Sequence, residues 1–226
     1  MNIVVIYLLT IVTVIITVSA QAYITSTYNE YSKVMNKRNI SGYEAARIVL
    51  DQNGLNNIKV TEVKGYLTDH YDPNKKVVAL SSNNYHDSSV SSISVACHEC
   101  GHAIQDKTGY KMMKIRASLV PLVNFSSYMG YLAITLGVLA SSFSLIYIGI
   151  LLECVILLFQ IVTLPVEIDA SKRALKEIEK HQILDKDEQS SGKTVLIAAA
   201  LTYVASVATA LIQILKLLII YRRRDE

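Results

Sequence analysis

The sequence predicts a mainly α-helical protein in which four apolar helices span a membrane and a small α+β domain follows the first of them. Of its 226 residues, 51% are hydrophobic and 18% are charged, whereas an average soluble domain has about 25% charged residues. The mean hydropathy is +0.33. The apolar residues form long uncharged runs, as a bilayer requires of the segments that cross it.

Four apolar runs account for the predicted spans. The first covers residues 1–20, and we expect it to be a retained anchor because it lacks the basic start and short apolar core of a signal peptide. Residues 119–165 are long enough for two spans, which we expect to be joined by a tight turn near Ser141. Residues 195–226 contain the fourth span and a basic tail.

Polar residues dominate the segment 21–118. Ser41 and Glu44 have the spacing of a capping box, which predicts an amphipathic helix over 42–53. A strand over 65–71, a turn and a return strand over 76–80 predict a small antiparallel sheet or hairpin. Asp87 or Ser88 is then expected to cap a helix that runs to about Asp106.

A second polar segment, 166–194, is helical in character, and Pro165 before it is expected to begin a new or kinked helix. The net charge of +3, with no basic stripe interleaved with aromatic residues, gives no indication of nucleic-acid binding. Most lysines and arginines lie in the two polar segments. The positive-inside rule therefore places both segments in the cytoplasm, although the arginines at 222–224 oppose this orientation.

The predicted helix ending near 106 contains the pattern H-E-x-x-H, formed by His98, Glu99 and His102. Two histidines four residues apart lie on one helix face and can bind one zinc ion per chain, while Glu99 can take a proton from a metal-bound water. The alternative, a pair of solvated surface histidines, fits poorly with the apolar residues around them. Cys97 and Cys100 point away from the histidines and are expected to be small buried hydrophobes.

A catalytic zinc needs a third protein ligand. Glu167 is the leading candidate, ahead of the remaining histidines His70, His86 and His181. To orient a ligating histidine we favour Asp169 over Ser171, although Ser171 shares a helix face with Glu167. Arg173 is a candidate to stabilise an oxyanion, or equally an interface charge.

Four stretches of the chain resemble the bacterial YugP-like family of neutral zinc metallopeptidases of the membrane. They are Leu67 to Pro73, His98 to Gln105, Leu164 to Ser171 and Ala199 to Ala205. The chain is also similar, more distantly, to gluzincin membrane proteases of the heat-shock type. That resemblance implies a zincin-like domain with Glu167 as the third ligand and a substrate-binding edge strand that includes Asp69 and His70. Ser171 stands where gluzincins commonly have an aspartate.

These features predict a zinc-dependent endopeptidase of the bacterial plasma membrane whose partners are a protein or peptide substrate and the lipid bilayer. Glu167 lies three residues beyond Leu164, about 4.5 Å along a helix, so the expected substrates are membrane-tethered or misfolded proteins near the bilayer. A catalytically silent zinc-binding scaffold or sensor is the alternative, which the presence of Glu99 disfavours. A transporter that uses Glu153 is disfavoured because one intramembrane carboxylate makes a poor pathway.

Overall fold

The computed structural model describes residues 2–223, and the chain divides into two compact units. The first unit, which we call the apolar unit, consists of Met1–Gln21, Lys114–Pro165 and Leu201–Glu226. The second, the polar unit, consists of Ala22–Met113 and Val166–Ala200. Each unit is held together by contacts of its own.

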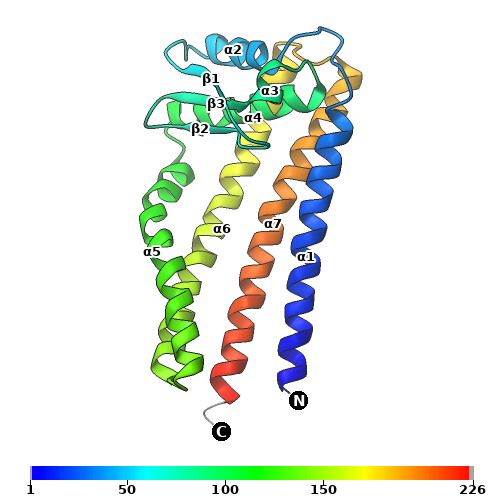
Figure 1. Cartoon of the computed structure of the whole chain (residues 1–226). Helices are drawn as coiled ribbons and strands as arrows, with labels where there is room; N and C mark the ends of the chain where they lie inside the picture. Colours follow the sequence, from blue (N-terminus) through cyan, green and yellow to red (C-terminus); the bar gives the residue numbers. More distant parts are fainter. Residues whose placement is uncertain (1, 224–226) are drawn as a thin grey trace. The chain divides into compact units, whose positions relative to one another are not determined.

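Four long helices supply the residues of the apolar unit: α1 (Asn2–Tyr31), α5 (Lys111–Leu139), α6 (Phe143–Lys180) and α7 (Lys186–Arg223) (Figure 1). Within the described residues, these are the helices that are long and apolar enough to cross a membrane, as predicted. α5 and α6 are joined by a tight turn in which Ser141 adopts a left-handed conformation with φ 53°. In this unit Ile146 and Ile150 of α6 pack with Leu217 of α7.

Two expectations about the segment after the third span need correction. No new helix begins at Pro165, because a proline removes only one hydrogen bond of a helix and α6 continues through it. The expected single helix over 166–194 is divided instead, since α6 ends at Lys180 and α7 begins at Lys186. Gln182 has φ 50° there, and the amide of Ile183 reaches back to the carbonyl of Ile178, which is the hydrogen bond that closes many helices.

The polar unit begins with the helix that the capping box predicted. α2 (Gly42–Gln52) starts after Ser41, whose side chain accepts a hydrogen bond from the Glu44 amide while the Glu44 carboxylate accepts one from the Ser41 amide. This reciprocal pair satisfies two amides that the first helical turn leaves without partners. The apolar face of α2, including Val49 and Leu50, is fully buried.

A three-stranded sheet follows, made of β1 (Lys59–Val63), β2 (His70–Asp72) and β3 (Val77–Ser81) in the order β1-β3-β2 (Figure 1). β2 and β3 form the predicted antiparallel hairpin. The sheet as a whole is mixed rather than antiparallel, because β1 pairs with β3 in parallel. The strand expected over 65–71 is extended only near its end, since Gly65 (φ 120°) and Leu67 (φ 54°) adopt conformations that no strand contains.

The short helix α3 (Ser82–His86) precedes α4 (Val90–Lys107). α4 begins one or two residues later than predicted, because Ser89 caps it by accepting a hydrogen bond from the Ser92 amide. α4 contacts α2, α3 and the hairpin strands (Figure 1). Cys97 and Cys100 lie in the resulting core, which confirms their predicted role as small buried side chains.

Candidate metal centre

The two motif histidines lie next to each other on α4, as a spacing of four residues requires. Their ring centroids are 4.8 Å apart and the rings are nearly perpendicular, at 85°. His102 is buried, with 7% of its surface exposed, and His98 is partly buried. The Nε2 atoms of both rings are therefore directed to one shared region.

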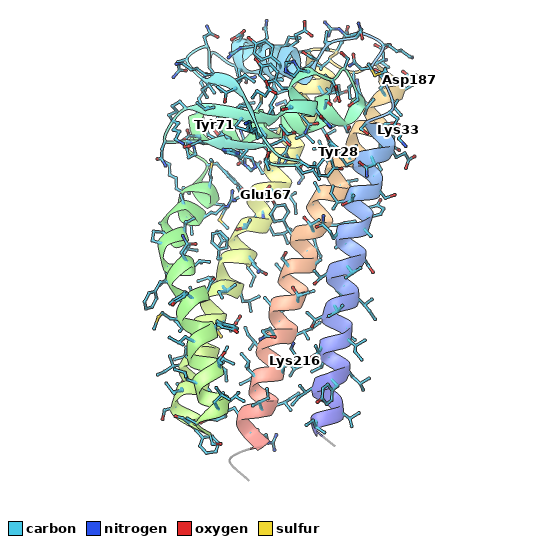
Figure 2. The ribbon with its side chains drawn as sticks, viewed as in Figure 1. Tyr28, Lys33, Tyr71, Glu167, Asp187 and Lys216 are labelled. Carbon is cyan, nitrogen blue, oxygen red and sulfur yellow. The ribbon has the colours of Figure 1, made fainter. Side chains whose placement is uncertain are left out.

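Glu167, labelled on α6 in Figure 2, is the third residue of the site. Its carboxylate reaches the region that the two rings share. One oxygen, Oε2, lies 3.2 Å from His98 Nε2 and 3.4 Å from His102 Nε2. Glu167 is 2% exposed, and one ligand atom from each of the three residues lies within 4.8 Å of the others. Folding thus joins the third predicted ligand to the two histidines.

The three side chains fit a zinc ion in chemistry, and the two distances from Glu167 to the histidines fit its spacing. Zinc bonds of about 2.0–2.1 Å in a tetrahedral arrangement put neighbouring ligand atoms about 3.3–3.4 Å apart, close to the two nitrogen–oxygen distances at Glu167. Two imidazoles and one carboxylate form a known set for catalytic zinc and leave the fourth position open. Burial opposes a charge on His102, but the hydrogen bond to Glu167 and the charges of Glu99 and Glu167 outweigh it and raise the pKa of His102. The two neighbouring carboxylates therefore stabilise a positive charge at the position of His102.

Gly101, between the two histidines, allows α4 and α6 to approach closely enough for this arrangement. A Cβ atom on Gly101 would lie 2.4 Å from the carbonyl oxygen of Ala170 on α6, far inside van der Waals contact. The backbone of α6 therefore passes directly against the motif helix at this position, three residues beyond Glu167.

Glu99, the predicted general base, is buried with 8% of its surface exposed. Burial raises the pKa of Glu99, and the two neighbouring histidines oppose part of that rise. A buried carboxylate beside a metal site is typical of a residue that exchanges protons during a reaction. Its catalytic role stays a prediction.

The outer nitrogens of the two imidazoles have different partners. His98 Nδ1 lies 3.1 Å from Ser171 Oγ, and His102 Nδ1 lies 3.0 Å from Gln105 Oε1. Our preference for Asp169 over Ser171 as the direct partner of a histidine is therefore wrong. Ser171 lies one helical turn beyond Glu167 and shares its face, whereas Asp169 is about 200° round the helix.

Asp169 and Arg173 form an ion pair beside the site. Arg173 Nε lies 2.6 Å from Asp169 Oδ2, and the same oxygen accepts a hydrogen bond from Gln105 Nε2 at 2.9 Å. The guanidinium also contacts Thr108 Oγ1 at 3.4 Å and lies over the ring of Tyr110. These contacts match the interface charge that was the second interpretation of Arg173.

His70 is the first residue of β2, an edge strand of the sheet, and Asp69 immediately precedes it. The Asp69 carboxylate accepts hydrogen bonds from the Ser81 amide at 2.7 Å and from Asn84 Nδ2 at 2.9 Å, so it connects this strand to β3 and α3. His70 is exposed. The other two histidines pair elsewhere, His86 with Glu62 and His181 with Glu177.

Gln105 is the site residue that the sequence predictions missed. It is fully buried and follows His102 by three residues on α4, which puts both side chains on one face. That spacing was the available signal.

Comparison with known proteins gives two nearly full-length matches. The family described as "Putative neutral zinc metallopeptidase" matches residues 6–222. The chain is 42% identical over 208 residues to "Putative membrane protease YugP" of Bacillus subtilis (strain 168), and the match covers 92% of each chain. No solved structure matches. On the strength of these two nearly full-length matches, the chain belongs to this neutral zinc metallopeptidase family.

Proposed function

We propose that the protein is a membrane-bound, zinc-dependent endopeptidase that cleaves membrane-tethered or misfolded proteins near the bilayer surface. The observation that carries this proposal is the convergence of His98 and His102 of α4 with Glu167 of α6 in a group that could hold a metal ion. Glu99 lies on α4 beside the two histidines. Family membership and a relative named as a membrane protease support it.

The roles of the residues follow from their chemistry. A zinc ion held by His98, His102 and Glu167 would polarise the scissile carbonyl and lower the pKa of a bound water towards about 7. We assign to Glu99 the removal of a proton from that water and its delivery to the leaving amine. The burial that raises the pKa of Glu99 suits this task, because a base works best when its pKa is near the working pH.

The proposed substrate class follows from two features. Glu167 lies only three residues beyond Leu164, the end of the apolar part of α6, which supports a reaction close to the bilayer. β2 is an edge strand, and an extended peptide can add to such an edge through backbone hydrogen bonds. We also propose that the polar unit faces the cytoplasm, because most of the lysines and arginines lie in the polar segments.

Glu99→Gln tests the proposed function. The variant should keep its zinc, because Glu99 is not one of the three ligands, and should lose about 100-fold or more of its casein-cleaving activity. Zinc content and casein cleavage are measured on the purified wild type and variant. Zinc in both proteins with cleavage by neither would favour the scaffold or sensor over the peptidase.

A further inference from the structure

Gln105 links His102 to α6 through a chain of hydrogen bonds. Its Oε1 lies 3.0 Å from His102 Nδ1. Its Nε2 donates to the carbonyl oxygen of Val166 at 2.7 Å and to Asp169 Oδ2 at 2.9 Å. Arg173 Nε in turn donates to the same oxygen of Asp169 at 2.6 Å.

The partners on α6 determine which way the Gln105 amide faces. A backbone carbonyl and an ionised carboxylate only accept hydrogen bonds, so the NH₂ group of Gln105 must face Val166 and Asp169. The amide oxygen is then the atom that faces His102. Because Gln105 is fully buried, no solvent competes for these positions.

This orientation determines where the proton of a neutral His102 ring lies. The amide oxygen can only accept, so Nδ1 must carry the hydrogen and Nε2 must be the nitrogen with the free lone pair. Nε2 is the atom that lies 3.4 Å from Glu167 Oε2. We propose that Gln105 is a positioning residue that holds His102 in the tautomer and ring orientation needed to bind zinc, an inference that rests on the proposed zinc site.

His98 lacks an equivalent constraint. Its Nδ1 faces Ser171 Oγ, and a hydroxyl can donate or accept, so this contact is compatible with either tautomer. Of the two histidines, His102 is therefore the one whose tautomer is fixed, and Gln105 fixes it. Asp169 holds the Gln105 amide in place and is itself paired with Arg173.

Two variants separate positioning from simple packing. Gln105→Met keeps the length of the side chain but removes the acceptor, and zinc affinity should fall about 10–100-fold. Gln105→Glu keeps an acceptor towards His102, and its protonated form supplies one O–H donor, towards either the Val166 carbonyl or Asp169. Its zinc affinity should therefore stay closer to that of the wild type. Gln189→Met is the matched control, because it removes a hydrogen bond that a glutamine side-chain amide donates to a backbone carbonyl, that of Leu184.

Zinc affinity is measured by competition with a chelating indicator. The tautomer of His102 is read from NMR of ring-labelled, metal-free protein at alkaline pH, with His102→Gln used for assignment. The wild type should show the hydrogen on Nδ1, and Gln105→Met should show a mixture of tautomers. Equal zinc affinity in wild type and Gln105→Met, or an unchanged His102 tautomer, would overturn this inference alone. A wild type that takes up no zinc would overturn the proposed function as well.

Discussion

Asp69 and His70 are neighbours in the chain but have opposite surroundings. Side chains of an extended segment alternate between its two sides. The Asp69 carboxylate is turned towards Ser81 and Asn84 and accepts their hydrogen bonds, while His70 is exposed. A structural role for Asp69 and a free surface for His70 follow from this alternation.

We expect Asp69→Ala to lower the free energy of unfolding by about 1–3 kcal/mol, because the buried amide of Asn84 and the Ser81 amide lose a charged acceptor. His70→Ala, at the exposed neighbour, should change it by less than about 0.5 kcal/mol. Both values come from denaturant titrations of the protein in detergent. If Asp69→Ala left stability intact and raised only the KM for substrate, Asp69 would be a substrate contact instead.

At the scale of secondary-structure elements, the site depends on how closely α4 and α6 pack. Glu167 reaches the two histidines because the α6 backbone at Ala170 lies directly against Gly101, where any side chain would collide. Gly101 binds nothing itself, but the absence of a side chain there allows α6 to bring Glu167 within reach of the two histidines.

Gly101→Ala tests this dependence. The added Cβ must displace the backbone of α6, so we expect a loss of about 1–3 kcal/mol in stability together with weaker zinc binding. Gly192→Ala is the control, since the nearest atoms there, 3.0 Å from the added Cβ, belong to the side chains of Leu184 and Ser94 and not to a backbone that carries a ligand. Wild-type zinc affinity in a folded Gly101→Ala protein would show that the helix spacing does not set the ligand geometry.

Elements that local signals determine were predictable from the sequence. The capping box at Ser41 and Glu44 marks the start of α2, and the hairpin follows from its turn. The parallel pairing of β1 with β3 was not predictable, because no local pattern specifies a partner across a crossover. The choice of Ser171 and Gln105 over Asp169 as histidine partners depends on the packing of two helices that are far apart in the sequence.

At the scale of the whole molecule, the parity of four spans means that the two polar segments share one side of the membrane and that the turn between α5 and α6 lies on the other. Lys64 lies in the polar unit, and Ser141 lies in the turn between α5 and α6. With four spans, these two exposed positions should be on opposite sides of the bilayer.

Cysteine labelling checks the orientation that we propose. With the native cysteines replaced, Ser141→Cys should react with a membrane-impermeant maleimide in intact cells, and Lys64→Cys should react only after the membrane is opened. The reverse pattern would mean that the polar unit faces outwards and that the arginines at 222–224 decide the topology.

Substrate attachment to the bilayer should also affect the rate. A peptide fused to a membrane-spanning segment should be cleaved about tenfold faster or more than the same peptide free in solution, because both reactants share one membrane and their effective concentration rises. Cleavage is followed in reconstituted bilayers, with Glu99→Gln giving the background. Equal rates for the two forms would argue against a preference for membrane-tethered substrates.

The most direct test of the whole account is the zinc content of two matched variants of α6. Glu167 and Glu177 are both buried glutamates on this helix, but Glu177 pairs with His181 and Asn53 instead of the motif histidines. Elemental analysis of purified protein should find one zinc ion per chain in the wild type and in Glu177→Gln, and little in Glu167→Gln. A Glu167→Gln protein that keeps its full complement of zinc would contradict the metal centre described above.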